Sequence, residues 1–342
     1  MVRPINVLRH DYAPELEIPR LIAPRAVTRL LFPRANFFRV AFLVKLFYTD
    51  HFVLPLPDEH PFPMSKYRLL RERIVAADWA RDCELLVPDA ATDDELQLAH
   101  CEDYIERVVR GQLTDKEVKR IGFPWSSELV QRSRRSTGAT IAAARAASRD
   151  GVSANLAGGT HHAFRDRGEG YCVFNDVAVA ARVMQRDGAS MSILIVDCDV
   201  HQGNGTAEIF AGDPSVTTFS MHGLRNYPLK KTASDLDIAL PNGTGDQEYL
   251  SRLELALARL LRAPYDFVFY LAGADPYEKD RLGRLALSKE GLRHRDEIVL
   301  SRCREMRLPV AIVMAGGYAE DVDEIVDIHA TTIRCAMSFA DS

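Results

Sequence analysis

Short hydrophobic runs alternate with amphipathic segments along most of the chain. Four runs are almost continuously apolar, at 192–198, 215–220, 266–272 and 309–315. Strands that are buried on both faces have this appearance. The segments between and before them repeat apolar residues at helical spacing, and several begin after a capping Asn, Asp or Ser. We expect helices at 138–149, 177–187, 247–261 and 289–306. This alternation predicts an α/β fold with three layers, in which helices cover both faces of a mainly parallel central sheet.

The chain is predicted to form one large domain. Its 342 residues, 47% of them hydrophobic and 27% charged, are enough for a large core. We find no flexible linker and no repeat that would divide it. Residues 1–45 differ from the rest, with eight Lys or Arg against three Asp or Glu and with five prolines. We expect this basic segment to be an extension outside the core, either a solvated arm or a targeting or membrane-surface segment, and 46–342 to be the domain.

Charge and cysteine content argue against several classes of protein. The formal net charge is −5, and Lys and Arg are scattered rather than gathered in a stripe, which argues against nucleic-acid binding. The six cysteines form no CxxC pair, so neither a zinc ribbon nor a disulfide framework is indicated. A cytoplasmic location fits this pattern. The apolar stretch at 40–48 is too short to span a bilayer, and the charged, proline-containing start does not read as a secretory signal.

Polar residues follow the apolar run at 192–198. Asp197, Asp199 and His201 alternate along the chain, so in an extended backbone their side chains point to the same side. Two carboxylates and an imidazole can neutralise a divalent ion and leave one position open for water, as catalytic zinc requires. The alternative is a solvated loop or a helix cap. Because ligand crevices of open parallel sheets lie at the carboxyl ends of the strands, a site is expected here.

Three further elements carry candidate chemistry. The pair His161 and His162 follows two glycines and could supply two proton-transfer groups, although such a pair is often a surface accident. Asp275 ends the run at 266–272 and could equally cap a helix. Tyr318 follows Gly316 and Gly317, and its hydroxyl could donate to a developing oxyanion, or it could be an ordinary rim tyrosine.

Together and in this order, these elements resemble the histone deacetylase family. The resemblance extends from roughly Tyr48 to Ala336. It is carried by five segments: GGTHHAFRDRGEGYCVFND at 158–176, DCDVHQGNGT at 197–206, SMHG at 220–223, AGADPYEKDRLG at 272–283 and AGGY at 315–318. The segments HQGNG at 201–205, HHAFRDRG at 161–168 and HPFP at 60–63 are most similar to the class IV branch and its bacterial relatives. The resemblance implies the arginase/deacetylase-like fold.

The resemblance also implies roles for individual residues. Asp199, His201 and Asp275 would bind Zn²⁺, or Fe²⁺, and Tyr318 would polarise the scissile carbonyl. His161 and His162 would serve the hydrolytic water. Each histidine of the pair leans on an acid in the family, and Asp197 would be that partner for His161. His162 would instead face Asn204, which is neutral, so its pKa should be lower than that of an acid-backed histidine.

Substrate and potassium sites follow from the same resemblance. Gly170 and Tyr171 match the wall of the acyl-lysine tunnel, and Tyr227 is a candidate for the opposite wall. Such an aromatic slot suits the methylene stem of lysine. A structural K⁺ ion near the catalytic metal would be held, partly through backbone carbonyls, by Asp197, Asp199, His201, Ser220 and Met221. Lys279 and Asp280 replace the Gly-Asp that often follows the zinc-binding acid of the family.

The implied activity is removal of an acyl group, acetyl or longer, from a lysine-type amine by a zinc-dependent hydrolase. Its substrate would be an acyl-lysine protein or an acylated small amine. Two enzymatic alternatives stay open, an acetylpolyamine amidohydrolase and an arginase-type ureohydrolase with two manganese ions. A non-enzymatic alternative is an acyl-lysine-binding module. Acyl-chain length and oligomeric state cannot be read from the sequence.

Overall fold

A single parallel sheet forms the centre of the protein. The computed structural model describes residues 43–57 and 59–340. Its eight-stranded sheet has the order β2-β1-β3-β8-β7-β4-β5-β6, and every neighbouring pair is parallel. The strands are β1 (Val44–Phe47), β2 (Cys83–Leu86), β3 (Val152–Asn155), β4 (Ile193–Asp197), β5 (Val216–Gly223), β6 (Leu236–Leu240), β7 (Phe267–Leu271) and β8 (Val310–Val313). Parallel strands require crossover connections, which the helices supply.

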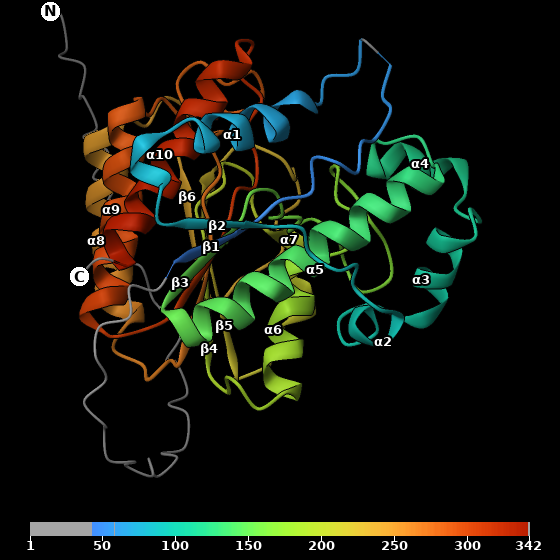
Figure 1. Ribbon diagram of the computed structural model, residues 1–342, viewed down its shortest axis with the longest axis horizontal. Coiled ribbons are helices and arrows are strands. Elements are labelled where there is room, and N and C mark those ends of the chain that lie inside the picture. The colour runs from blue at the N-terminus through green and yellow to red at the C-terminus, as the bar shows by residue number, and fades with distance from the viewer. Residues whose placement is uncertain (1–42, 58, 341–342) are drawn as a thin grey trace, which may run out of the picture.

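Helices cover both faces of this sheet (Figure 1). One layer holds α1 (Ser65–Val75), α8 (Asp246–Leu260), α9 (Lys289–Glu305) and α10 (Val322–Ala340). The other holds α5 (Ser127–Asp150) and α6 (Asp176–Arg186), which pack on each other. The shorter helices are η1 (Asp78–Ala80), α2 (Asp93–Leu96), α3 (Glu102–Val109), α4 (Asp115–Ile121) and α7 (Asn204–Ile209). Helices α2, α3 and α4 lie beyond the sheet on the α5 side in Figure 1. No described helix is both long and apolar enough to cross a membrane.

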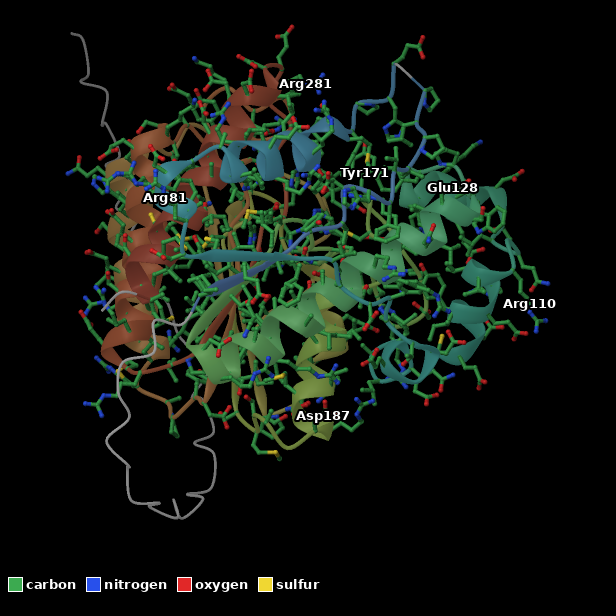
Figure 2. The ribbon with its side chains drawn as sticks, in the orientation of Figure 1. Arg81, Arg110, Glu128, Tyr171, Asp187 and Arg281 are labelled. Carbon is green, nitrogen blue, oxygen red and sulfur yellow. The ribbon has the colours of Figure 1, made fainter. Side chains whose placement is uncertain are left out.

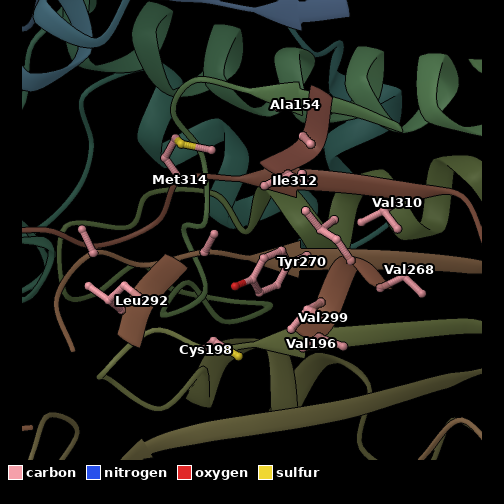
Figure 3. Packing of buried hydrophobic residues seen from close by; sticks show 14 of the residues in the cluster. Ala154, Val196, Cys198, Val268, Tyr270, Leu292, Val299, Val310, Ile312 and Met314 are labelled. Carbon is pink, nitrogen blue, oxygen red and sulfur yellow. The ribbon is translucent and has the colours of Figure 1, made fainter. Parts of the chain in front are cut away.

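The two hydrophobic cores are set by the alternation of side chains along each strand. On β8, Val310 and Ile312 pack with the α8–α10 layer, whereas Ala311 and Val313 pack with α5 and α6. Figure 3 shows the first of these cores, with Ile312 between residues from neighbouring strands. Because successive residues of a strand face opposite sides, a central strand under two helical layers must be apolar at every position.

The predicted three-layer α/β fold is confirmed, and the sheet is wholly parallel. All four predicted strands and all four predicted helices are present, with ends shifted by a few residues except at α5. That helix begins at Ser127, whose preceding residue Ser126 accepts a hydrogen bond from the Leu129 N–H, so the predicted start at Gly138 was wrong. Position 138 inside the helix is a glycine because a Cβ there would collide with the backbone oxygen of Asp89.

The predicted domain boundary at residue 45 also needs correction. Strand β1 begins at Val44, and its Lys45 pairs with Ser153 of β3 and Glu84 of β2 in the sheet. The Lys45 ammonium reaches the Asp150 carboxylate at 2.7 Å, which lets a charged residue sit inside the strand. Residues 1–42 of the predicted extension lie outside the described residues. Strands β1, β2, β3 and β6 were not predicted, since they are short and three of them carry a charged residue.

Burial in the sheet should control stability, and two leucines offer a matched comparison. Leu194 on β4 is 0% exposed, whereas Leu255 on α8 is 71% exposed. We expect Leu194→Ala to lower the free energy of unfolding by about 2–5 kcal/mol, because a cavity opens in a close-packed core. Leu255→Ala should change it by less than about 0.5 kcal/mol. Urea unfolding of both variants measures this difference, and equal losses would contradict the assigned burial.

Candidate active site

Four neighbouring strands deliver the candidate residues to one end of the sheet. The order β3-β8-β7-β4 places side by side the strands that precede the histidine pair, Tyr318, Asp275 and the 199–201 segment. Since all of these strands are parallel, their carboxyl ends meet at the same edge. Residues that are far apart in the sequence are therefore brought together without any long loop.

Asp199, His201 and Asp275 form a buried cluster of potential metal ligands. The Nδ1 atom of His201 lies 3.0 Å from Asp199 Oδ1 and 3.1 Å from Asp275 Oδ2. One ligand atom from each residue lies within 4.8 Å of the others, and no other such group of His, Cys, Asp or Glu occurs in the described part of the chain. All three side chains are buried. The alternation along the sequence predicted that Asp197, Asp199 and His201 converge; the structure gathers Asp199 and His201 with Asp275, while Asp197 contacts His161.

Backbone amides orient both carboxylates of the cluster. The N–H of Gly316 donates to Asp199 Oδ2 at 2.8 Å, and the N–H of Val200 donates to Asp275 Oδ1 at 2.8 Å. Each acid therefore has one oxygen held by these amides and turns the other toward His201, whose own backbone N–H also donates to Asp199 Oδ1 at 2.8 Å. A Cβ at position 316 would collide with the Asp275 carboxylate, so glycine is required there.

The electrostatics of the cluster fit a divalent cation. Burial raises the pKa of Asp275, and the neighbouring charge of Asp199 raises it further. Burial alone would lower the pKa of His201, but hydrogen bonds and charges from Asp199 and Asp275 raise it to about 10. Two buried acids thus compete for one positive partner. Two carboxylate oxygens and one imidazole nitrogen are a donor set that Zn²⁺ accepts, with room for a further ligand.

The two histidines have opposite electrostatic environments. His161 Nδ1 lies 2.6 Å from Asp197 Oδ2, and the charges of Asp197 and Asp199 outweigh burial and raise the His161 pKa to about 9. His162 Nδ1 lies 2.7 Å from Asn204 Oδ1. Burial, together with the nearby charge of His161, holds the pKa of His162 well below its usual value. Side chains that differ in this way can divide the roles of acid and base between them.

Tyr318 follows β8 and lines the same cavity as His162 and His201. Its backbone N–H donates to Asp280 Oδ2 at 2.6 Å, and its carbonyl accepts a hydrogen bond from the Arg281 side chain at 2.9 Å. Burial keeps the pKa of Tyr318 well above its usual value, so the phenol stays protonated. Its hydroxyl has no hydrogen-bond partner among the described residues. A protonated, uncommitted phenol can donate to substrate.

Aromatic rings line the approach to the cluster. Gly170 has a φ of +57°, and a Cβ there would meet His162 Cδ2 at 2.7 Å. Tyr171 follows it and packs 6.1 Å from the ring of Tyr318, centroid to centroid. Tyr227 meets the ring of His162 edge-on at 4.9 Å. Gly170, Tyr171 and Tyr227 thus all line a cavity of about 430 Å³ that leads to His162, His201 and Tyr318.

The predicted potassium ligands lie at the ends of two adjacent strands. Asp197 on β4 is the register partner of Ser220 on β5, and Met221 follows it. Asp197, Asp199, His201, Ser220 and Met221 are all buried. Their binding of K⁺ stays a prediction.

Several residues of the site were missed in the sequence. Phe62 packs on the rings of Tyr171 and Tyr318, at 5.3 and 6.0 Å between centroids. The buried Lys66 donates to the backbone oxygen of Gly317 at 3.2 Å. Asp280 was noted only as part of the Lys279-Asp280 pair that differs from the family, although its carboxylate accepts a hydrogen bond from the Tyr318 backbone N–H. The HPFP segment at 60–63 was the one available signal, because the packing partners of Phe62 lie far away in the sequence.

Comparisons with known proteins agree with this geometry. The histone deacetylase domain family matches residues 60–333. An uncharacterized protein of Picosynechococcus sp. is 44% identical over 290 residues, which cover 84% of this chain and 97% of that protein. Histone deacetylase 2 of Arabidopsis thaliana is 30% identical over 278 residues, with 78% of this chain and 72% of the relative covered.

A solved structure of the same type supports the family on the level of the fold. The crystal structure of a histone deacetylase homologue complexed with SAHA superimposes with a TM-score of 0.72 and 26% identity, and covers 86% of this chain and 84% of that one. The family match spans most of the described sheet and all of the candidate site residues. The resemblance to the histone deacetylase family that the sequence indicated is therefore confirmed. The chain belongs to the histone deacetylase family.

Proposed function

We propose that this member of the family is a metal-dependent deacylase that hydrolyses acyl-lysine amides. Family membership supports a deacetylase-type hydrolase; the metal and the substrate are the proposal. The observation that carries it is one cavity that joins the Asp199, His201 and Asp275 cluster to the histidine pair and to the Tyr318 phenol. The resident ion would be Zn²⁺, or Fe²⁺, and class IV membership is proposed from Asn204 and the HPFP segment.

The residues of the chain divide the steps of amide hydrolysis. A divalent ion in the cluster would act as a Lewis acid on the acyl carbonyl and on water. His162, held with a low pKa, would accept a proton from the attacking water and pass it to the leaving amine nitrogen as the C–N bond breaks. His161 beside it, charged through Asp197, would stabilise the developing negative charge. The Tyr318 hydroxyl would donate to the oxyanion. Phe62 and Tyr171 would exclude water from the lysine stem.

The mouth of the cavity favours an anionic substrate. It is lined by four cationic side chains and by no acidic one: Lys119, Arg120, Arg225 and Arg284. None of the four forms an ion pair with another described residue. The exposed Leu229 and Leu282 complete the rim. Like charges repel, so a polyamine with its remaining ammonium groups would be opposed, whereas a peptide with acidic residues around the acyl-lysine would be attracted.

The other functions are less consistent with the site. A ureohydrolase of the arginase type would need ligands for two ions, and the described residues hold one ligand group. A module that only bound acyl-lysine would not require two adjacent histidines with different partners, an acid for His161 and an amide for His162. It would also not require the Tyr318 phenol beside the cluster. We therefore propose turnover rather than recognition alone.

Removing a cluster acid should remove the ion. We expect Asp275→Ala to lose most of its bound metal and its deacylase activity, because the remaining two ligands no longer neutralise and hold the ion. Metal content per chain after dialysis, together with hydrolysis of acetyl- to myristoyl-lysine peptides, measures both effects. The exposed Asp166 provides the control, since Asp166→Ala should stay loaded and active. A fully loaded and active Asp275→Ala enzyme would refute the ligand assignment.

Loss of one hydroxyl should separate chemistry from binding. We expect Tyr318→Phe to lower kcat by about 100-fold or more with unchanged metal content, because an oxyanion donor of this kind contributes roughly 3–4 kcal/mol. Steady-state kinetics on an acetyl-lysine peptide measures it. Tyr265 precedes β7 at the opposite edge of the sheet, so Tyr265→Phe is the matched control and should keep its kcat. A normal kcat for Tyr318→Phe would leave Tyr318 as a rim residue.

Charge at the mouth should appear in substrate preference. We expect kcat/KM to be about tenfold or more higher for an acetyl-lysine flanked by acidic residues than for one flanked by basic residues, since several exposed charge pairs contribute about 0.2–1 kcal/mol each. Acetylspermidine should be poorer still. The preference should shrink in 1 M salt and in the Arg120→Gln/Arg284→Gln variant.

The control for this prediction is Arg81→Gln, because Arg81 lies well away from Tyr171 in Figure 2. That variant should keep the wild-type preference. An equal kcat/KM for the acidic and basic peptides at low salt would show that the cationic rim does not select substrate. A preference for acetylspermidine would favour the polyamine alternative.

A further inference from the structure

Glu169 lies behind the neutral partner of His162. Its Oε1 atom accepts a hydrogen bond from Asn204 Nδ2 at 2.7 Å and another from the Tyr227 hydroxyl at 2.9 Å. Asn204 in turn presents Oδ1 to His162 Nδ1 at 2.7 Å. A chain of contacts therefore runs from a carboxylate through an amide to the histidine, and the same carboxylate anchors a tunnel tyrosine. Neither the metal cluster nor the rim uses Glu169.

The carboxylate selects one of the two orientations of the Asn204 amide. An amide has one side that only donates and one that only accepts, whereas an ionised carboxylate only accepts. With Nδ2 toward Glu169, the arrangement is favourable. The flipped amide of the buried Asn204 would press its oxygen against the negative carboxylate of Glu169, which is unfavourable. Glu169 thus determines that the amide oxygen faces His162.

The orientation of the amide determines which nitrogen of His162 carries the proton. Oδ1 of Asn204 can only accept, so the hydrogen must lie on Nδ1 of a neutral ring. The lone pair is then on Nε2, where a general base needs it. A flipped amide would donate to Nδ1 and leave the proton on Nε2, which would make the ring useless as a base.

We propose that Glu169 is a positioning residue for the deacylase reaction, which fixes the Asn204 amide and through it the Nδ1-protonated form of His162. The inference rests on the proposed function, because it assigns a task to His162 as base. It explains how a neutral Asn can replace an acid at position 204. The Glu169 carboxylate, on the far side of Asn204 from His162, supplies the orientation that an acid at position 204 would otherwise give the ring.

The local backbone builds Glu169 into this place. Residues 169–172 form a turn in which the Cys172 N–H donates to the Glu169 carbonyl at 3.0 Å. Gly170 takes a positive φ, and its N–H donates to the Arg120 carbonyl at 3.1 Å. A side chain at position 170 would meet both His162 and Tyr227. The turn therefore packs Glu169, His162 and Tyr227 against one another.

The first test separates hydrogen bonding from bulk. Glu169→Ala leaves the amide free to flip, so we expect kcat to fall about tenfold while KM changes less than threefold and the metal content is unchanged. Glu169→Gln keeps the bulk and an oxygen that can accept from Asn204, but its NH2 group can also donate to the flipped amide, so it should recover only part of the lost turnover. Asp166→Ala in the same loop is the control and should match the wild type. A Glu169→Ala enzyme with wild-type kcat would overturn the proposal.

The second test exchanges the partners. Asn204→Asp places a second carboxylate against Glu169 at hydrogen-bond distance, and the two like charges repel. We expect this variant to lose turnover although the acid is what many relatives carry. Adding Glu169→Gln supplies an amide that donates to the new carboxylate, so the double variant should be at least about fivefold more active than Asn204→Asp. A purely structural Glu169 would give additive losses instead.

A measurement without turnover separates the proposal from the proposed function. Nitrogen-15 NMR of histidine-labelled, Zn²⁺-loaded protein distinguishes the two neutral tautomers, with the His162 signals identified by their loss in His162→Asn. We expect the Nδ1-protonated form in the wild type and a mixture in Glu169→Ala. The same single tautomer in both would overturn the role of Glu169. If the wild type hydrolysed no acyl-lysine substrate, the proposed function would fail, while the tautomer would still decide the inference.

Discussion

The structure depends on the burial of two carboxylates, Asp199 and Asp275, at the end of its central strands. Taking charges out of water is costly unless they are paired or bound to a cation. Here the cost is lowered by backbone N–H groups from Gly316 and Val200, and by the His201 ring between the acids. Position 316 after β8 is a glycine because no side chain fits beside these carboxylates. We propose a metal ion as the further partner of this cluster.

The order of the strands places these buried charges at one end of an otherwise apolar sheet. Strands β3, β8, β7 and β4 are neighbours, and each is covered on both faces by helices that bury its apolar side chains. Apart from Ser153, whose hydroxyl donates to the Lys45 carbonyl, the polar residues of these strands lie at the carboxyl ends, where loops supply hydrogen-bond donors. The rigid, apolar body of each strand therefore holds one group of the site in place, and no flexible segment has to do so.

The histidine pair shows how partners rather than residue type set chemical roles. His161 and His162 are adjacent and equally buried, yet the pKa of the first is raised and that of the second lowered. The charges of Asp197 and Asp199 raise the pKa of His161. His162 has the neutral Asn204 at Nδ1, so burial and the nearby charges of His161 and His201 lower its pKa. Glu169 adds direction to the amide without placing its charge against the ring. At the rim, we propose that the unpaired cationic side chains select the substrate by its charge.

The sequence by itself determined the fold class, four adjacent strands of the sheet (β8, β7, β4 and β5) and the candidate ligands, because local patterns carry them. Continuous apolar runs reveal doubly covered strands, and Asp199 and His201 are two residues apart on one extended segment. Only the tertiary structure decided what depends on distant neighbours. Strand β1 was not predicted because it contains Lys45, whose charge is neutralised by Asp150 more than a hundred residues away. The predicted helix began too late, at Gly138, because that glycine is required by the loop at Asp89 that crosses α5. Phe62, Asp280 and Glu169 acquire their places through partners that no spacing in the sequence connects to them, so their contribution to the site appears only when the chain is folded.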